Sequence, residues 1–372
     1  MKSGLLKSGL ACLLAACFLW PAGGCRRFEK RKPEMVYLWM RDVYLRDRVA
    51  AVSNQTGEVK NGEAMEVVAH GRRFLKVKTA GGQVGWLPER AVIDAKTYGQ
   101  FEKLAGENNS DWVVAEGTLR DEMYLHDKPG RETDRLYLLR ANAKVAMLKR
   151  ATVPRYSGEE ARRIEAMKPA KKALPGEAAR PEQEMEDWWL VRDKNGHTGW
   201  MLGSHVDADV SYTVGQYAEG QRIAGNYRIA TVHDADAPER PADEPEYVMA
   251  LSQLKQGLPY DFDQIRVFTW SLRHHRYETA FRLRGIEGYF PIKITSEPGK
   301  AGGTEPVFTF TIAGSPTVAV NTETGIALPA HPRTIAFALR DTLVKRVGAD
   351  MEPIPTMRDE TEKKPERKKR RR

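Results

Sequence analysis

Gly82-Gln83-Val84-Gly85-Trp86-Leu87 has a close counterpart later in the chain, Gly196-His197-Thr198-Gly199-Trp200-Met201. Each of these two stretches follows a short apolar segment, at residues 74–78 for the first and residues 188–192 for the second. In residues 74–78 apolar and charged side chains alternate, which is the pattern of a half-buried β-strand. The repeated turn therefore predicts two related hairpins.

The sequence upstream of these turns is repeated as well. Residues 43–47 read Val-Tyr-Leu-Arg-Asp, and residues 123–127 read Met-Tyr-Leu-His-Asp. Tyr44 and Tyr124 are about 80 residues apart, whereas Trp86 and Trp200 are about 114 residues apart, so the second copy holds about 34 more residues. The spacing predicts two copies of one small β module, the second interrupted by an insertion.

The positive charge of the chain lies at its ends. The 372 residues carry a net charge of +9, of which Lys2 and Lys7 contribute +2 and residues 363–372 contribute +7. The body between them is neutral, so no basic patch facing peptidoglycan and no specific nucleic-acid partner are predicted. The basic C-terminal segment is either a solvated tail or a salt-sensitive contact to an anionic polymer.

All three cysteines, Cys12, Cys17 and Cys25, lie in the first 25 residues, beside an apolar run from residue 10 to residue 22. Two lysines precede that run and small residues follow it, which is the pattern of an export signal. The run is short for a membrane span. A cleaved signal without lipid and an uncleaved anchor remain the alternatives.

Residues 22–25, Ala-Gly-Gly-Cys, resemble the end of a bacterial lipoprotein signal, in which the cysteine becomes lipidated. The resemblance implies a signal peptide at residues 1–24, a lipid anchor on Cys25 and a membrane as partner. Residues 14–17 match the motif better but leave a short apolar core, so Cys17 is the alternative. A processed Cys25 leaves no thiol nucleophile in the mature chain. Mass spectrometry of the mature N-terminus distinguishes these possibilities.

Residues 35–95 contain short alternating segments, separated by turn residues at intervals of about ten. Their order, ending in Gly85-Trp86, resembles that of the bacterial SH3-like domain over about 60 residues. In that family the glycine permits a close backbone approach and the aromatic residue packs at the end of the barrel. The resemblance implies two SH3-like barrels, at residues 35–95 and 112–207, that recognise wall peptides or other extended peptides.

Three features interrupt this pattern between and within the two copies. Residues 96–111 contain apolar residues three apart, which predicts a short helix between the copies. Ser157-Gly158-Glu159-Glu160 is a capping box that begins a helix extending to about residue 167. Residues 168–187 have almost no large apolar side chains and are predicted to form a mobile surface loop. The insertion is thus placed at about residues 151–187.

The chain after residue 212 resembles no family that we recognise. Six segments with strand patterns lie between residues 265 and 339, and glycines separate them, so residues 212–350 are predicted to form a β-sandwich-like domain. Residues 238–245 are acidic and proline-rich and predict a linker or exposed loop. Residues 351–372 are predicted to be a basic disordered tail, so the fold class is mainly β with disordered N- and C-terminal tails.

No catalytic residue, metal site or cofactor is predicted. The ligand-type side chains at residues 233–236 have no further partner nearby in the sequence. His274 and His275 occupy a turn between two strands, and Asp261 and Asp263 are a conceivable carboxylate pair. An envelope hydrolase that gathers these groups in the C-terminal domain is the alternative function. A third possibility is a purely structural partner with an exposed apolar patch on the C-terminal sheet.

The ligand-binding candidates are Tyr44, Trp86, Tyr124 and Trp200. A groove lined by these rings offers a peptide or sugar large contact faces with polar edges. For the two tryptophans, packing in the barrel core is the favoured interpretation. The sequence thus predicts a lipid-anchored, non-catalytic binding or scaffolding protein of the cell envelope, with peptidoglycan or envelope proteins as partners.

Overall fold

The computed structural model describes residues 33–156, 158–167, 184–237, 242–299, 303–315 and 318–357. Within these residues the chain is mainly β, as the sequence predicts, and its strands form three seven-stranded sheets and one two-stranded sheet. The predicted lipidation sites, the signal peptide and the basic residues 363–372 lie outside the described residues. No helix among the described residues is long and apolar enough to cross a membrane.

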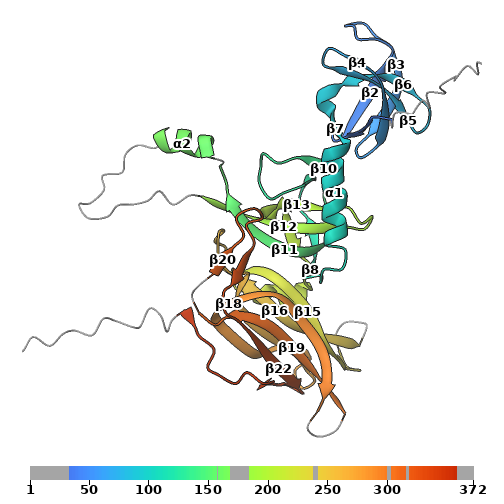
Figure 1. The fold of residues 1–372 in the computed structure, drawn as a ribbon. Coiled ribbons are helices and arrows are strands. Elements are labelled where there is room, and N and C mark those ends of the chain that lie inside the picture. Colours follow the sequence, from blue (N-terminus) through green and yellow to red (C-terminus); the bar gives the residue numbers. More distant parts are fainter. Residues whose placement is uncertain are drawn as a thin grey trace, which may run out of the picture. The chain divides into compact units, whose positions relative to one another are not determined.

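The first seven strands form one antiparallel sheet, which we call the first module (Figure 1). Its strand order is β3-β2-β6-β5-β4-β1-β7, and a short 3-10 helix, η1 (Glu89–Ala91), precedes the last strand. The strands are β1 (Met35–Leu38), β2 (Asp42–Arg46), β3 (Gln55–Lys60), β4 (Ala64–Gly71), β5 (Phe74–Thr79), β6 (Val84–Pro88) and β7 (Val92–Asp94). Alternate residues of these strands, including Leu38, Leu45 and Val77, fill a common core.

The next seven strands repeat this arrangement and form the second module. Its order, β10-β9-β13-β12-β11-β8-β14, is the order of the first module strand for strand, and η2 (Gly203–His205) takes the place of η1. The strands are β8 (Ala115–Leu119), β9 (Met123–His126), β10 (Arg135–Leu139), β11 (Lys144–Pro154), β12 (Met185–Asp193), β13 (Thr198–Leu202) and β14 (Val206–Ala208). The two modules are copies of one fold.

A β-bulge occupies the same place in both modules. The register between β4 and β5 shifts between Val67 and Ala69, and the register between β11 and β12 shifts between Met147 and Lys149. The bulge residues are therefore Val68 and Leu148. A bulge turns its extra residue out of the regular alternation. This shared irregularity fixes the residue-by-residue equivalence of the modules, which the sequence alone did not show.

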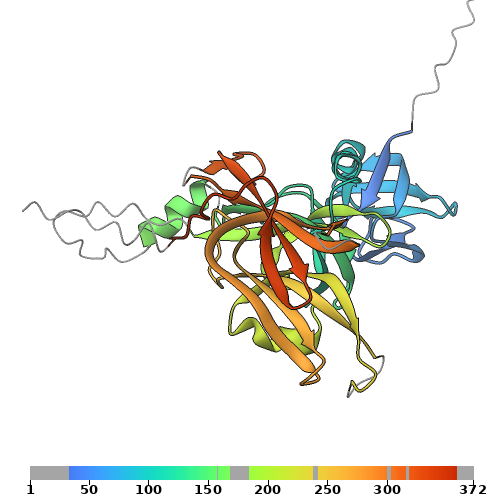
Figure 2. The same ribbon diagram turned by 90° about the horizontal axis from the view of Figure 1, so that it is seen from below.

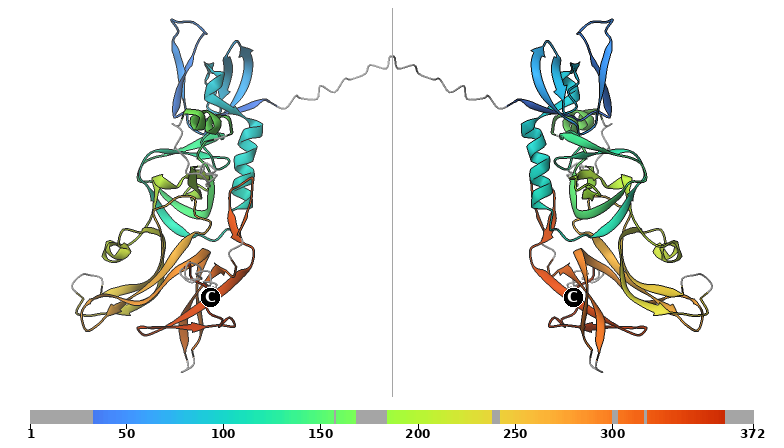
Figure 3. Two further views of the ribbon diagram at one scale, coloured as in Figure 1. Left: turned by 90° about the vertical axis from the view of Figure 1, so that its left-hand side faces the viewer. Right: turned by 90° about the vertical axis from the view of Figure 1, so that its right-hand side faces the viewer.

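The predicted helix between the copies is α1 (Ala95–Glu107), shown from two sides in Figure 3. Asp94 caps it, since the carboxylate accepts a hydrogen bond of 2.8 Å from the backbone N–H of Thr97. Phe101 is buried in the core of the second module, and Tyr98 stacks on Tyr37 of the first. The helix thus contacts both modules.

A side chain of the first module also pairs with a strand of the second. The amide of Asn61 donates to the carbonyl of Leu136 at 2.6 Å and accepts from the backbone N–H of Leu138 at 2.8 Å. These two bonds satisfy polar groups of β10.

The insertion of the second module lies between β11 and β12. Its helix is α2 (Gly158–Met167), with bounds close to the predicted ones. The predicted mobile loop falls mostly on residues 168–183, outside the described residues, and β12 begins at Met185. In the first module the equivalent connection is the tight turn between Gly71 and Phe74.

The remaining strands form the third module, a continuous antiparallel sheet in the order β15-β16-β17-β18-β19-β22-β23. Its elements are α3 (Tyr212–Gly215), η3 (Gln216–Ala218), β15 (Arg222–His233), β16 (Asp243–Ser252), β17 (Phe262–Ser271), β18 (Arg276–Pro298), β19 (Thr304–Ala313), β22 (Pro332–Arg340) and β23 (Leu343–Val347). A separate hairpin consists of β20 (Val318–Val320) and β21 (Ala327–Pro329).

One core contains residues from β15 to β22, including Val248, Phe262, Phe308 and Phe337, so this single sheet encloses its own core in the manner of a sandwich. The other side of β16 and β17 is covered by α3 and η3 through Val214 and Ala218.

Three boundaries in the third module differ from the prediction. The disordered tail was predicted to begin at residue 351, but Ile354 packs against the core of the sheet and Met357 against a smaller cluster. The proline-rich segment was expected to be a loop through Pro245, but β16 begins at Asp243, because residues 243–245 pair with β15. Residues 277–283 and 289–294 were expected to be separate strands. They belong to β18, which Figure 2 shows in orange as one long curved strand. Gly285 takes a positive φ of 72° within it, a bend without a chain reversal.

Candidate binding faces of the two related modules

The two Gly-Trp turns lie at the start of equivalent strands, β6 and β13. A Cβ atom added to Gly85 would lie 2.7 Å from the Cβ atom of Leu45, and one added to Gly199 would lie 2.7 Å from the Cβ atom of Leu125. Both positions require glycine because a neighbouring strand passes too close for a side chain. The glycines therefore hold the following tryptophans at equivalent places in the two sheets.

The register of the first module places Trp86 on the face opposite the core. Arg46 of β2 and Lys76 of β5 lie directly across from Trp86, while the core residues Leu75 and Leu87 point the other way. Because side chains alternate along a strand, the residues that share this face can be read from the pairing. Together with the bulge residue Val68, they form the first outer face: Tyr44, Arg46, Val68, Phe74, Lys76, Val84, Trp86 and Pro88.

The same pairing in the second module gives the equivalent residues. His126 and Leu190 lie across from Trp200, as Arg46 and Lys76 lie across from Trp86. The second outer face consists of Tyr124, His126, Leu148, Trp188, Leu190, Thr198, Trp200 and Leu202.

The two equivalent faces differ in exposure. Trp200 and Leu148 are each 3% exposed and belong to one buried cluster. Three residues cover this cluster: Leu104 of α1, Val113, and Ile326 of the β20–β21 hairpin. In the first module Val68, which corresponds to Leu148, is 54% exposed. The second face is an internal packing surface, whereas the first is open.

The structure distributes the four predicted ligand-binding residues between these faces. Tyr44 is 45% exposed and Trp86 is half-buried, both on the first outer face. Tyr124 contacts Trp39 edge to face, and the guanidinium of Arg135 lies 4.5 Å from the ring centroid of Trp39. None of the four rings contacts another among the described side chains, and Trp200 is 3% exposed, so it does not line an open groove with the other three.

Neither tryptophan packs in the core of its barrel. The favoured interpretation was therefore wrong for Trp86, which lies on the open outer face. Trp200 is buried as that interpretation required, but in the outer cluster and not in the cluster of Leu125, Val191 and Met201 that fills the barrel.

His126, the counterpart of Arg46, is a buried titratable group on the second outer face. Its ring lies edge to face against Trp188, and its Nδ1 lies 2.9 Å from the hydroxyl of Thr133. Burial, with a smaller contribution from Arg135, lowers the pKa of His126 to about 4. The imidazole is therefore neutral at pH 7.

We expect this histidine to make the protein less stable in acid. The unfolded chain binds the proton with a pKa of about 6.5, so the stabilising effect of the neutral ring is complete above that pH and is lost as the pH falls towards 4. Between pH 7.5 and pH 5 the loss is on the order of 2 kcal/mol. Urea unfolding at both pH values checks this, with His126→Gln as the comparison. Parallel losses in wild type and variant would contradict it.

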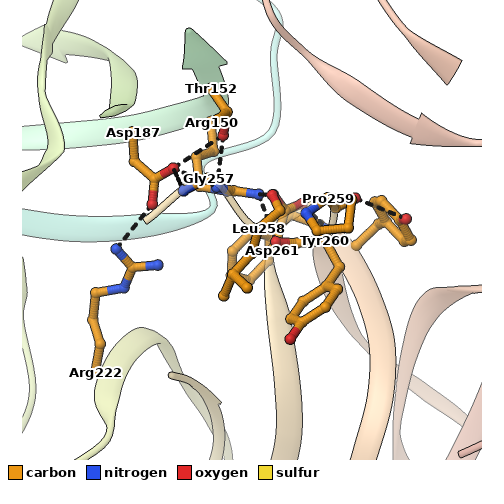
Figure 4. Close-up of polar contacts among 11 residues, drawn as sticks. Arg150, Thr152, Asp187, Arg222, Gly257, Leu258, Pro259, Tyr260 and Asp261 are labelled. Atoms are coloured by element: carbon orange, nitrogen blue, oxygen red, sulfur yellow. Dashed lines mark hydrogen bonds and ion pairs between the residues drawn. The ribbon is translucent and has the colours of Figure 1, made fainter. Parts of the chain in front are cut away.

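The second and third modules are joined by a buried arginine, Arg150 of β11 (Figure 4). Its Nε donates to Asp261 at 2.9 Å, and its two amino groups donate to Asp187, Thr152 and the carbonyls of Leu258 and Tyr260. These five bonds use all five donors of the guanidinium. Although burial opposes it, the two carboxylates hold the pKa of Arg150 above its ordinary value.

The carboxylates around Arg150 have further partners. Asp187 also accepts from Arg222 at 3.1 Å and from the backbone N–H of Gly257 at 3.1 Å, and Asp261 accepts from the backbone N–H of Phe290. Neither Arg150 nor Asp187 is predicted as a site residue from the sequence. The only signal for Arg150 is that it and Lys149 are charged residues among the apolar ones of residues 147–153.

The groups considered for a hydrolase do not converge in the third module. His233, His274 and His275 each pair with a different carboxylate, those of Asp243, Glu278 and Asp234 respectively. Asp261 precedes β17 and contacts Arg150, whereas the histidines at residues 274–275 follow the other end of that ten-residue strand. That separation is roughly 30 Å.

Asp263 and the loop at residues 233–236 have local roles as well. Burial raises the pKa of the Asp263 carboxyl. Hydrogen bonds from Trp270 and His275 lower the pKa of Asp234. In the described parts of the chain, no three His, Cys, Asp or Glu side chains come close enough to hold a metal ion.

Comparison with known proteins adds little to this geometry. No family model and no curated protein matches the chain. Two solved structures from Trichomonas vaginalis are similar to it, each with a TM-score of 0.16. NlpC2 is 9% identical, and the match covers 50% of this chain and 54% of that one. NlpC1 is 8% identical, and the match covers 68% of this chain and 88% of that one. The chain thus spans about half the length of NlpC2.

Proposed function

We propose that this protein is a lipid-anchored binding or scaffolding protein of the cell envelope that acts without catalysis. Its two related modules are bacterial SH3-like domains, Cys25 carries the lipid, and the ligand is peptidoglycan or a peptide of an envelope protein. The first module supplies the ligand contact. The second and third modules form the scaffold, joined by the buried Arg150.

One observation supports this proposal, which is the difference between the two outer faces. Equivalent aromatic and apolar residues are covered by the chain itself in the second module and left open in the first. Tyr44, which is 45% exposed, and the half-buried Trp86 offer large, rigid contact surfaces with polar edges. Truncation of such residues at an interface typically costs about 2 kcal/mol or more, which is roughly a 30-fold loss of affinity.

A retention experiment on isolated sacculi tests the wall-binding form of this proposal. The purified full chain is expected to sediment with sacculi, and Trp86→Ala and Tyr44→Ala are each expected to weaken retention roughly 30-fold. Tyr212→Ala is the matched control, because Tyr212 is an aromatic residue of the third module that is 88% exposed. Absence of retention, or equal retention in all four proteins, would count against peptidoglycan as the ligand.

A further inference from the structure

The second outer face shows what kind of group covers such a surface. Gly325, in the turn between β20 and β21, accepts a hydrogen bond of 2.9 Å through its carbonyl from the backbone N–H of Thr152. The next residue, Ile326, packs on the cluster that contains Trp188 and Trp200. A polypeptide turn thus supplies one backbone carbonyl and one branched aliphatic side chain.

This contact is close and leaves no space for a larger residue in the turn. A Cβ atom on Gly325 would lie 2.5 Å from the carbonyl oxygen of Thr152 and 2.7 Å from Cγ1 of Val153. Gly325 also takes a positive φ of 69°, which glycine adopts without strain. The hairpin therefore fits this end of β11 closely, as a bound peptide segment does.

The first outer face has no equivalent cover among the described residues. Tyr44, Val68 and Val84 are all more than one-third exposed, although the counterpart of Val68 is buried and Thr198, the counterpart of Val84, is 1% exposed. Both faces carry aromatic or apolar side chains at the positions of Tyr44, Val68, Phe74 and Trp86, so the first face offers a similar apolar surface to a segment from elsewhere.

The first outer face differs from the second in charge. Arg46 and Lys76 replace His126 and Leu190, and the turn at residues 72–73 adds Arg72 and Arg73 where the second module has its insertion. No ion pair joins any of these four cations to a carboxylate within the described part of the chain. Arg46 donates only to the carbonyl of Ser53, at 3.3 Å.

Three carboxylates also lie on this side of the sheet. Asp42 is paired with Lys60, Glu58 with Tyr44 and Glu66 with Lys78 across neighbouring strands. Counting Lys60 and Lys78, six cations face these three anions, so the surface favours a partner with negative charge.

The terminal segments of the chain do not have the charge of such a partner. Residues 26–32 contain five basic residues and one acidic residue, and residues 363–372 contain eight and one. Like charges facing each other oppose association.

We infer that the first outer face binds an acidic peptide segment of another protein, which places an aliphatic side chain against Trp86 and Val68 and its carboxylates beside Arg46 and Lys76. This inference rests on the proposed function and specifies that the ligand is a protein segment and not peptidoglycan. Binding of this kind weakens with added salt, since the cations at the rim are exposed.

Fluorescence polarisation with three labelled, end-capped hexapeptides tests the inference on the full chain. Their one-letter sequences are EDGIDE, KKGIKK and EDGSDE. We expect EDGIDE to bind at least tenfold more tightly than either of the others. Lys76→Glu and Arg72→Glu should each weaken its binding at least tenfold. Lys345→Glu in β23, an exposed lysine of the third module, should leave it unchanged.

Circular dichroism verifies that the variants are folded, and Arg72→Glu lies in an exposed turn where the charge reversal does not disturb the core. No binding of EDGIDE, or binding unaffected by both reversals, overturns the inference. Retention on sacculi that depends on Trp86, together with no binding of EDGIDE, overturns it while leaving the proposed function intact. Binding of EDGIDE without retention on sacculi supports it and removes peptidoglycan as the ligand.

Discussion

Replacement of Arg150 by methionine is expected to lower the free energy of unfolding by about 3–5 kcal/mol. The side chain is 3% exposed, and its removal leaves the carboxylate of Asp187, 1% exposed, with one cation in place of two. The carboxylate of Asp261 and two backbone carbonyls lose their partner as well. Because these groups belong to the second and third modules, the loss also removes several of the polar contacts between the two modules, whereas Asp187 keeps its contacts with Arg222 and Gly257. Urea unfolding followed by circular dichroism measures the effect.

An exposed ion pair provides the matched control. Arg120 contacts Asp207 through two hydrogen bonds, but the two side chains are 60% and 54% exposed. Arg120→Met should therefore cost no more than about 1 kcal/mol. Equal losses for Arg120→Met and Arg150→Met would show that the buried network contributes little to stability.

The fold of the first two modules could be predicted largely from the sequence. The β-strand alternation and the two glycines before Trp86 and Trp200 are local signals, and each glycine lies at the same distance from the apolar segment that precedes it. Their physical basis is also local, because each glycine allows one neighbouring strand to approach. The apolar residues three apart in α1 and the capping-box pattern at residues 157–160 are local signals too, so these helices could be predicted as well.

The candidate site could not be predicted in the same way. Val68 and Leu148 are both apolar and both sit in a bulge, and their difference in exposure depends on Leu104, Val113 and Ile326, which are far away in the sequence. The contact of Arg150 with Asp261 joins residues 111 positions apart. The neutral net charge of the body likewise concealed the cations around Trp86, since a sum over residues contains no information about where they lie.

Truncation of Trp200 and of Trp86 should distinguish a tryptophan that stabilises the fold from one that contacts a ligand. Trp200→Ala is expected to lower the free energy of unfolding by about 3–5 kcal/mol, because it leaves a cavity among Leu148, Trp188 and Leu190. Trp86→Ala, at the equivalent position, should lower it by only about 1 kcal/mol, since the indole is partly exposed and water can occupy the vacated space. The two variants are compared by urea unfolding under one set of conditions.

The binding data should show the reverse order. Trp86→Ala is expected to abolish most retention of a protein that is still folded, whereas Trp200→Ala should affect retention only under conditions where the protein begins to unfold. If instead both substitutions destabilise the protein equally, the first outer face must be covered in solution, and the segment that covers it would then be the occupant to identify. Equivalent residues in one chain thus serve as controls for each other, since the strand pairing is the same while the covering segments and the charges beside the tryptophan differ.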